Sequence, residues 1–303
     1  MILNVASILR FLFSLYLTLK ICRKANKKKS LSPSGCYAAF IVGLIVSYSN
    51  FCHLVALMTF FYASNKATKY KQDFKRKFDS EFKENGQRDW IQVFSNGFFA
   101  TFFSAFYISE CGHGERPIDF EYDYKPSWYS IAVLASLSCS CGDTLASELG
   151  TAFDQSKNNV YHILKWKKVP KGLNGGVSFI GTLSSALGGF LIGLSYYICL
   201  KVSLSIKEFF DFGRYDLIQP QWPLVLIGLF CGLLGSLIDS LLGAYFQYSG
   251  YNIRTMKIEN RPGKNVKHLS GYDLLSNNQV NFLSCLIMAL AGPFLSLKLY
   301  KFF

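Results

Sequence analysis

Three acidic side chains stand within strongly apolar stretches of this sequence. Asp143 and Glu148 lie in the segment Cys141–Gly150, and Asp239 is the only acid in the segment Gly235–Ala244. A carboxylate at the centre of a membrane helix costs about 2.5–3.5 kcal/mol on insertion scales, so such a residue needs a compensating role. We predict that Asp143 and Asp239 hold a metal ion, and that Glu148 is a further ligand or orients the acceptor.

Each aspartate also has a structural alternative. On a helix Asp143 shares a face with Ser147, and Asp239 shares a face with Gly243, so both face small neighbours that allow close approach. The alternative for Asp143 is a capping pair with Ser140 at the start of a helix. The alternative for Asp239 is a hydrogen bond to a serine on a neighbouring helix.

A lysine and a glycine-rich turn precede another apolar stretch. Lys171 is followed by Asn174, Gly175 and Gly176. Glycines that open a helix expose backbone N–H groups and the positive end of the helix dipole to an anion. These four residues are predicted to cradle nucleotide phosphates, although no Walker motif occurs. The alternative is a plain turn that enters a tightly packed helix.

An arginine and two asparagines complete the set of polar residues. Arg88 precedes Trp90 and is placed to reach a phosphate while the indole anchors at the interface. Asn277 and Asn281 enter the last apolar stretch, where they would bind a headgroup or a base, or cap the helix. Acids, a Lys–Gly loop, an arginine and amides together match Mg²⁺-assisted phosphoryl transfer at a lipid surface. The expected cofactors are therefore Mg²⁺ and a nucleoside triphosphate, CTP or ATP.

The composition indicates that membrane helices position these residues. Hydrophobic residues make up 50% of the 303 residues and aromatic residues 17%, which a single water-soluble core cannot easily absorb. The net charge of +13 lies in short loops between apolar stretches rather than on one continuous face. This distribution is typical of membrane topology and attraction to lipid headgroups, and it argues against nucleic acid as a partner.

The fold class predicted from these stretches is all-α, a polytopic bundle of about eight transmembrane helices in a single domain over residues 1–303. A helix needs about 20 apolar residues to cross a bilayer. The expected spans are Met1–Ile21, Cys36–Tyr48, Phe51–Ala63, Ile91–Ile108, Trp128–Leu149, Val177–Leu200, Trp222–Tyr245 and Val280–Tyr300. The second and third spans are short, and they form either a hairpin or one bent helix, which leaves seven or eight spans.

Alternating loop charges favour eight spans over seven. Lys and Arg are concentrated in the loops Cys22–Ser30, Lys66–Asp89, Asp154–Lys171 and Gln247–Ser276. Short loops rich in these residues stay on the cytosolic side, so both termini are expected on the lumenal or outer side. Within the second of these loops Tyr70, Phe74, Phe78 and Phe82 recur every four residues, which predicts an interfacial amphipathic helix.

At its polar motifs the sequence resembles the transmembrane protein nineteen family, a polytopic family named from a domain of unknown function. The matching residues are Gly142–Gly150, Lys168–Pro170, Asn174–Ser178, Gly235–Ser236, Asp239–Ala244, Asn277, Asn278, Asn281, Gln87, Arg88, Trp90, Gln92 and Val93. The resemblance covers about residues 34–303. One plant chloroplast member is assigned as a phytyl-phosphate kinase, and related folds phosphorylate or cytidylylate polyprenyl lipids.

The resemblance implies a kinase that converts an isoprenoid monophosphate, of prenyl or phytyl type, into its diphosphate at the cytosolic face. Its partners would be the isoprenoid lipid phosphate and membrane lipids. The sequence departs from the plant case because no Ser- and Arg-rich transit segment is present, which predicts the endoplasmic reticulum or another endomembrane. The rival function is a transporter or lipid-moving protein that uses the same acids as coupling sites. A non-catalytic membrane scaffold is a third alternative.

Overall fold

The protein is a bundle of antiparallel helices with two small sheets. The computed structural model describes residues 5–70, 87–153, 159–210 and 219–302. The helices within these ranges are α1 (Val5–Lys27), α2 (Pro33–Ser49), α3 (Phe51–Lys69), α5 (Trp90–Cys111), α6 (Tyr124–Phe153), α7 (Phe179–Phe209), α8 (Pro223–Phe246) and α9 (Asn277–Tyr300).

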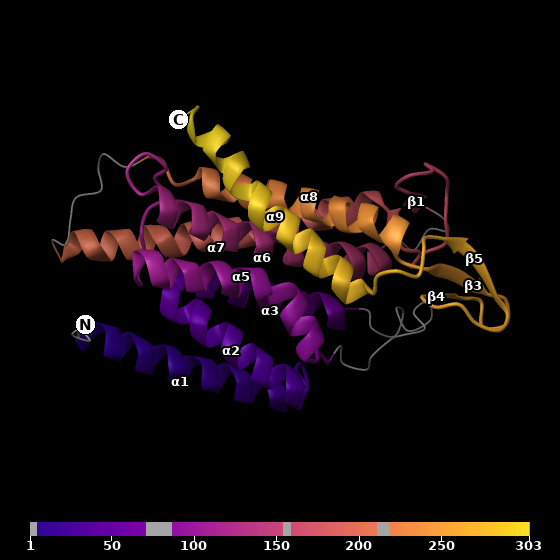
Figure 1. The fold of residues 1–303 in the computed structure, drawn as a ribbon, viewed down its shortest axis with the longest axis horizontal. Coiled ribbons are helices and arrows are strands. Elements are labelled where there is room, and N and C mark those ends of the chain that lie inside the picture. The colour runs from indigo at the N-terminus through magenta and orange to yellow at the C-terminus, as the bar shows by residue number, and fades with distance from the viewer. Residues whose placement is uncertain (1–4, 71–86, 154–158, 211–218, 303) are drawn as a thin grey trace.

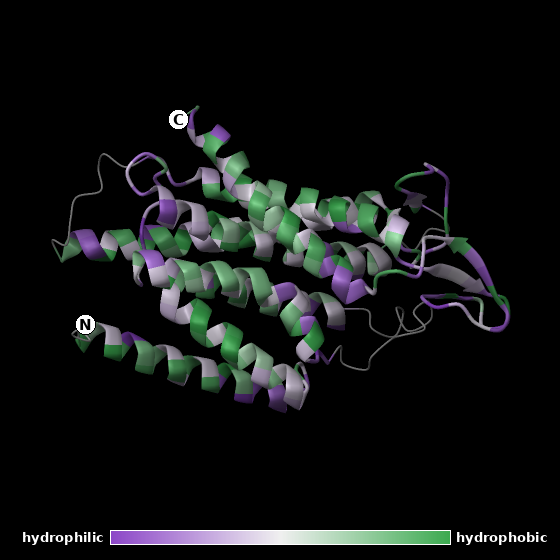
Figure 2. Ribbon diagram, viewed as in Figure 1, coloured by the Kyte–Doolittle hydropathy of each residue, from purple (hydrophilic) through white to green (hydrophobic). Residues whose placement is uncertain are grey.

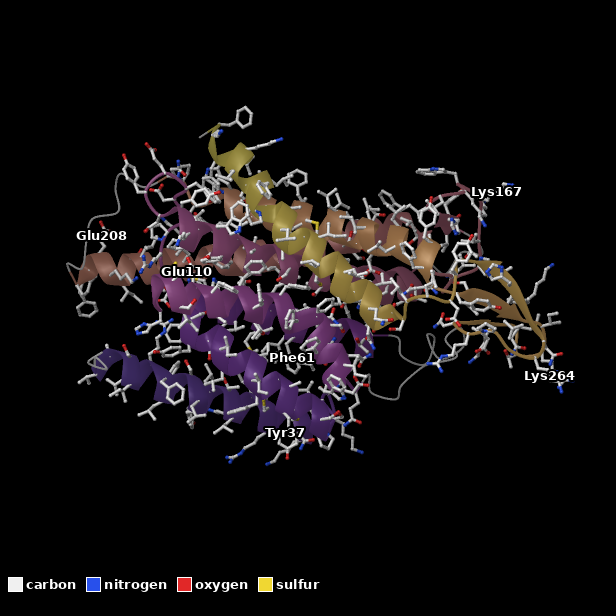
Figure 3. The ribbon with its side chains drawn as sticks, in the orientation of Figure 1. Tyr37, Phe61, Glu110, Lys167, Glu208 and Lys264 are labelled. Carbon is white, nitrogen blue, oxygen red and sulfur yellow. The ribbon has the colours of Figure 1, made fainter. Side chains whose placement is uncertain are left out.

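Successive helices run in opposite directions along the bundle (Figure 1). The helices α1, α3, α6 and α8 end where α2, α5, α7 and α9 begin, and we call this the basic-loop end. Lys167 and Lys264 project at the basic-loop end, whereas Glu110 and Glu208 lie at the opposite end (Figure 3). The start of α1 and the end of α9 also lie at the opposite end. This arrangement matches the alternation that the loop charges predict.

The hydropathy of the helices fits a multi-pass membrane protein. Six helices, α1, α5, α6, α7, α8 and α9, are long and apolar enough to cross a membrane, and α2 is a shorter apolar helix of 17 residues. Green, apolar residues dominate the helices, while purple, polar residues gather at the two ends of the bundle (Figure 2). The predicted helix-bundle class is confirmed. The second and third of the eight predicted spans, which correspond to α2 and α3, are not among the six full-length helices.

The second and third expected spans form a hairpin rather than one bent helix. Asn50 separates α2 from α3 with an extended backbone, and its side-chain oxygen accepts a hydrogen bond from the Cys52 amide. The amide of Asn50 caps the last turn of α2 by donating to the carbonyl of Val46. One residue thus ends the first helix and starts the second, because an asparagine side chain can replace a missing helical partner.

α6 forms the centre of the bundle and packs against α3, α5, α7, α8 and α9. Every residue of α6 from Ser130 to Gly142 is buried. Glycines bring α6, α7 and α8 into backbone contact, since a Cβ on Gly142 would lie 2.5 Å from the Gly232 carbonyl oxygen and one on Gly189 would lie 2.1 Å from that of Gly228. Close approach through small residues is the usual way in which membrane helices pack.

Two small antiparallel sheets form in the basic loops, which the sequence analysis did not predict. One pairs β1 (Tyr161–His162) with β2 (Gly176–Val177). The other has the order β4–β3–β5, formed by Lys257–Glu259, Ser249–Asn252 and Val266–Ser270. Both lie at the basic-loop end (Figure 1).

The predicted interfacial helix lies almost wholly outside the described residues. Of its aromatic positions, Phe74, Phe78 and Phe82 fall in the segment 71–86, which is not described. Tyr70, which follows α3, stacks on Phe153 at the end of α6, with ring centroids 5.0 Å apart.

Candidate functional site

The structure brings Asp143 of α6 and Asp239 of α8 together. The Ser236 hydroxyl, one turn before Asp239, lies 3.5 Å from the Asp143 Oδ1 atom. The two carboxylates are close enough for their charges to repel each other. Asp239 is about two turns from the end of α8 and Asp143 about three turns from the end of α6, so both lie in the half of the bundle nearer the basic-loop end.

α9 supplies the other side of this site. The Ser284 hydroxyl donates to Asp239 Oδ2 at 2.9 Å. With its amide nitrogen facing the acceptors, Asn281 donates to the same oxygen at 3.2 Å and to the Asn277 backbone carbonyl at 2.9 Å. The side chain of Asn277 is exposed at the start of α9. Asn281 thus joins the carboxylate site directly, whereas Asn277 contributes a backbone oxygen to it.

Small residues on α8 position Asp239 against α6. Gly235 lies one turn before Asp239, and a Cβ there would come within 2.5 Å of the Cys139 sulfur. Asp239 is 8% exposed as a result. No Lys, Arg or His side chain among the described residues forms an ion pair with either aspartate. Asp239 is buried and Asp143 is partly buried, and placing a negative charge on both without a cation is unfavourable in a medium of low dielectric, so a cation at this site would be stabilising.

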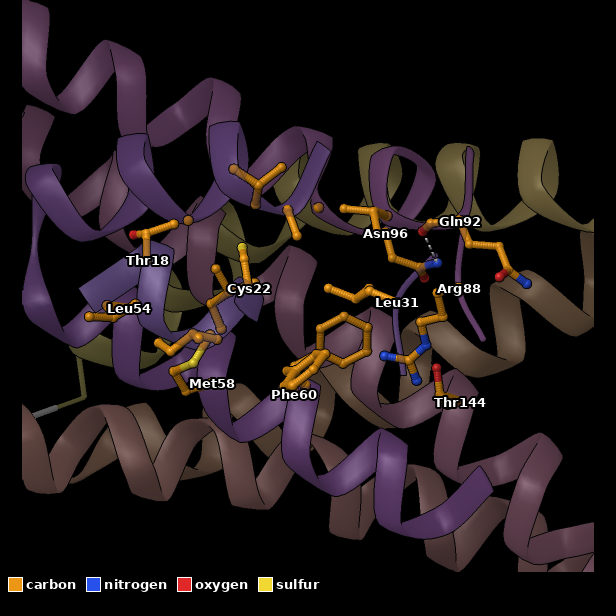
Figure 4. Close-up of a pocket in the computed structure, with 18 residues that line it drawn as sticks. Thr18, Cys22, Leu31, Leu54, Met58, Phe60, Arg88, Gln92, Asn96 and Thr144 are labelled. Carbon is orange, nitrogen blue, oxygen red and sulfur yellow. Dashed lines mark hydrogen bonds between the residues drawn. The ribbon is translucent and has the colours of Figure 1, made fainter. Parts of the chain in front are cut away.

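Arg88 lies at the polar end of a cavity between α1, α2, α3 and α5 (Figure 4). A short bridge with Leu31 fixes its backbone, since the Arg88 amide donates to Ser30 and its carbonyl accepts from Ser32. Its guanidinium lies 5.7 Å from the centre of the Phe60 ring and points toward Thr144 of α6. Within the described chain no side chain accepts a hydrogen bond from this guanidinium.

The cavity itself is mostly apolar. It encloses about 780 Å³ of empty space, part of it open to the outside, and Leu54, Leu57 and Met58 of α3 form much of one wall. Gln92, Asn96 and Thr144 join Arg88 at its polar end. Thr144 is the residue after Asp143, so the cavity and the carboxylate site meet at α6.

Glu148 lies apart from the two aspartates. Its negative charge raises the pKa of Arg88, opposing the stronger effect of burial, which lowers it. In the part of the chain that the structure describes, no three His, Cys, Asp or Glu side chains come close enough to hold one metal ion. Glu148 therefore acts on Arg88 through its charge, and the structure does not bring it to the aspartates as a third metal ligand.

The predicted phosphate cradle packs against the end of α8 and the three-stranded sheet. The side-chain amide of Asn174 donates to the Tyr248 carbonyl at 3.1 Å, and the backbone amide of Asn174 donates to the Ser249 hydroxyl at 3.1 Å. Gly175 has a positive φ of 79°, and a Cβ there would lie 2.4 Å from that of Ala244. Only glycine fits this conformation and this approach, so the turn is a packing element whatever else it binds.

The backbone of the same turn closes on itself. The Gly176 amide donates to the Leu173 carbonyl, and the Gly175 carbonyl accepts from Ile163. Lys171, two residues before the start of this closed turn, is half-buried. The turn precedes α7 and Arg88 precedes α5, so both lie at the basic-loop end.

The predicted site residues did not include several polar residues of this region, although a hydrogen bond from a serine on a neighbouring helix, as Ser284 donates, was the structural alternative for Asp239. Ser236 and Ser284 contact the aspartates, and Gln92, Asn96 and Thr144 line the cavity. The Gln92 Oε1 atom is buried and has no hydrogen-bond partner among the residues that the structure describes. A signal was present, because amide and hydroxyl side chains recur at helical spacing in apolar stretches, but the sequence does not show which helix faces them.

The donor set of the site suits a hard divalent cation. It consists of carboxylate, hydroxyl and amide groups, and Mg²⁺ is usually held by one or two carboxylates together with substrate phosphates. That neither aspartate forms an ion pair with a described residue is the observation that favours such an ion. The Arg88 guanidinium, which donates to no side chain among the described residues, is suited to a phosphate.

Comparison with known proteins places the chain in a family. It matches the family described as integral membrane protein DUF92 over residues 16–289. It is 33% identical over 291 residues to Protein PGR of Arabidopsis thaliana, covering 96% of this chain and 98% of the plant protein.

Relatives are also found in an archaeon and a cyanobacterium. An uncharacterised membrane protein of Methanocaldococcus jannaschii is 25% identical over 80% of this chain and 86% of its own. One from Synechocystis is 26% identical over 56% of this chain and 61% of its own. None of the solved structures matches the chain. The length of the family match and the identity to the plant protein show that the chain belongs to the DUF92 family of integral membrane proteins.

Proposed function

We propose that this membrane protein is a kinase that transfers a phosphoryl group from a nucleoside triphosphate to an isoprenoid monophosphate. The observation that carries the proposal is the junction at α6, where the Asp143–Asp239 pair adjoins an apolar cavity with Arg88 at its polar end. An isoprenoid phosphate has the same division into an apolar chain and one anionic group. The resemblance to the transmembrane protein nineteen family, with its plant phytyl-phosphate kinase, supports the same reaction.

The cavity suits the lipid chain. Mostly apolar pockets with a few polar groups that fix orientation are typical ligand sites, and this cavity has that division. Arg88 would bind the lipid phosphate, and the Phe60 ring beside its guanidinium would restrict the position of the cation. Thr144 would place that phosphate next to Asp143.

The acids would serve the transferred phosphoryl group. Mg²⁺, held by Asp143 and Asp239, would neutralise charge on the nucleotide phosphates during transfer. In the reaction, an oxygen of the lipid phosphate forms a bond to the terminal phosphorus of the nucleotide, and the bond from that phosphorus to the nucleoside diphosphate breaks. Ser284 and Asn281 would orient Asp239 through the hydrogen bonds that they donate to it.

The remaining predicted residues have supporting roles in this proposal. Glu148 would orient Arg88 through its charge, and Lys171 with the turn at Gly175 and Gly176 would face the nucleotide phosphates. Asn277 is exposed at the start of α9 and is available to a nucleotide base. The basic-loop end would face the cytosol in the endoplasmic reticulum or another endomembrane, as its Lys and Arg content indicates.

The test is a phosphorylation assay on the purified full-length protein in nanodiscs. Labelled CTP or ATP would be supplied with farnesyl, geranylgeranyl or phytyl monophosphate, and the lipid diphosphate would be measured. We expect product from the native protein and none from Asp143→Asn. Glu259→Gln, which alters an acid of β4 outside the site, is the matched control and should leave the activity unchanged.

The transporter alternative makes the opposite prediction. In that case liposomes would show proton- or sodium-dependent flux, nucleotide would not be consumed, and Asp143→Asn would abolish the flux. The kinase proposal is the better supported because both acids lie toward the basic-loop end of their helices, where Arg88 also lies, rather than at the midplane of the bundle. Absence of lipid diphosphate with every substrate and both nucleotides would overturn it.

A further inference from the structure

A second cavity at the basic-loop end lies between α1 and α3. α1 packs on α2, and the space between α1 and the last turns of α3 remains open over about 530 Å³. The residues that line it are Ile21, Lys24, Ala25, Lys28 and Ser30 from α1 and the turn after it, and Phe61, Tyr62, Asn65, Lys66 and Lys69 from α3. We call this space the lysine cleft.

Four of the lining side chains carry a positive charge and the others carry none. Lys24 lies in the last turn of α1 and Lys28 directly follows the helix, where its amide donates to the Lys24 carbonyl, while Lys66 and Lys69 are one turn apart on α3. Like charges at this spacing repel along a helix, and here two such pairs also border one cleft. None of the four forms an ion pair with an acid in the described ranges. An anion in the cleft would relieve the repulsion of all four.

The position of the cleft favours an anion that is attached to a lipid. The cleft lies where α1 and α3 end, so it would be level with the headgroups of a surrounding bilayer, and it opens between helices rather than into a closed pocket. Basic pockets between membrane helices on this side of a membrane bind anionic headgroups. Ile21 and Phe61 line both the lysine cleft and the apolar cavity, so an apolar wall continues from the charged rim. A free phosphate would leave that wall without a partner.

We propose that the lysine cleft binds the phosphate-bearing headgroup of an anionic membrane phospholipid. Lys24, Lys28, Lys66 and Lys69 surround the phosphate, and Ser30 and Asn65 lie at its side. Neither Asp143, Asp239 nor Arg88 lines this cleft. The site is therefore separate from the proposed kinase site, and binding there is independent of nucleotide and of catalysis.

The experiment measures lipid retention by the full-length protein with native mass spectrometry. Detergent-solubilised protein is titrated with phosphatidylglycerol, with neutral phosphatidylcholine, or with inorganic phosphate as a competitor. Salt near 0.5 M shortens the Debye length to about 4 Å, which suppresses diffuse attraction. We expect retention of phosphatidylglycerol but not of phosphatidylcholine. Each Lys→Gln change in the cleft should weaken binding about fivefold, from the value of roughly 1 kcal/mol per basic residue near a membrane surface.

A matched variant separates the cleft from general surface charge. The cleft variant combines Lys24→Gln, Lys28→Gln, Lys66→Gln and Lys69→Gln. The control removes the same charge outside the cleft, with Lys27→Gln, Lys29→Gln, Lys264→Gln and Lys267→Gln. The proposal predicts that the cleft variant loses at least tenfold more affinity than the control. The four corresponding Lys→Arg changes should retain binding, which would show that the charge rather than a loss of folding decides the result.

Three outcomes would overturn the proposal. Equal loss in the cleft variant and the control would assign the effect to diffuse charge. Full competition by inorganic phosphate at matched concentrations would assign the cleft to a soluble anion. Binding of phosphatidylglycerol that survives in the cleft variant would place the lipid elsewhere. A kinase assay on the cleft variant keeps the two proposals distinguishable, because its activity in neutral nanodiscs should equal that of the native protein.

Discussion

The two ends of the bundle differ in whether their acidic side chains are paired with a cation of the chain. We call the end that holds the paired acid Glu115 the closed end, and the basic-loop end, which holds Asp143 and Asp239, the open end. At the end opposite the basic loops, the Arg10 Nη2 atom donates to Glu115 Oε1 at 2.7 Å, and the Phe51 amide donates to the same oxygen at 3.0 Å. Lys207 donates to the Glu115 carbonyl, and Arg10 Nε donates to the Tyr48 carbonyl at 2.8 Å. The acid at this end is paired and hydrogen-bonded within the chain.

The uncharged network beside it is closed in the same way. The ring of His53 is fully buried, with Nδ1 within hydrogen-bond distance of Ser49 and Ser104 and Nε2 3.2 Å from the Ser130 hydroxyl. At the basic-loop end, by contrast, Asp143 and Asp239 contact hydroxyl and amide groups but no described cation. The difference indicates that the first network holds helices together, whereas the second is completed by something that the chain does not supply.

The largest expected effect is a loss of stability when the buried ion pair at the closed end is broken. Arg10→Leu leaves the buried Glu115 carboxylate without its cation, which should lower the free energy of unfolding by about 3–5 kcal/mol. Arg10 and Glu115 side chains are 12% and 10% exposed. The control is Lys125→Gln, which breaks an ion pair with the same 2.7 Å separation whose lysine is 67% exposed. That change should cost at most about 1 kcal/mol, as thermal unfolding in detergent would show.

The next effect concerns activity at the open end. Asp239→Asn keeps the shape of the side chain but removes a metal ligand, so we expect the kinase rate to fall at least about a hundredfold. Thermal stability should not fall, because the substitution removes the repulsion between Asp239 and Asp143. If Asp239→Asn lowered the Tm as far as Arg10→Leu does, the acids at both ends would have a structural role, and the difference between the two ends would be contradicted.

A smaller loss of stability is expected from a change in the turn around Asn174, which packs against the three-stranded sheet. Asn174→Ala removes the hydrogen bond to the Tyr248 carbonyl and should destabilise the turn by about 1–2 kcal/mol. Hydrogen exchange in Ser249–Asn252 should rise while the rest of the bundle is unchanged. Loss of nucleotide binding without faster exchange would instead assign Asn174 a direct role in the phosphate cradle.

The smallest expected effect is the pH dependence of the stability that Glu115 contributes at the closed end. Burial raises the pKa of Glu115, but the hydrogen bond and charge of Arg10 and the Phe51 amide lower it further, so the pKa lies below its ordinary value. A carboxyl with a lowered pKa contributes stability above its unfolded pKa of about 4.3, and this contribution is lost as the pH falls through the folded value. The Tm difference between the native protein and Glu115→Gln should therefore narrow below about pH 4.5. A constant difference down to pH 3 would contradict the assigned pairing.

The sequence by itself determined the helices and their alternation. Apolar length and loop charge are local properties, because each membrane helix must satisfy its own backbone hydrogen bonds within the bilayer. The basic loops therefore fall at one end of the bundle, as their composition predicted. The hairpin at Asn50 needed the structure, since 17 apolar residues are close to the limit for a span and the sequence allows either geometry.

Only the tertiary structure decided which polar residues meet. Asp143, Asp239 and Asn281 come from three helices that touch because glycines let α6 and α8 approach and set their rotation. Glu148, five residues after Asp143, acts on Arg88 through its charge instead, and Asn174 donates a hydrogen bond to the Tyr248 carbonyl beside the sheet. Spacing along one helix gives the face of a residue, but the partner on that face depends on packing between helices far apart in the sequence.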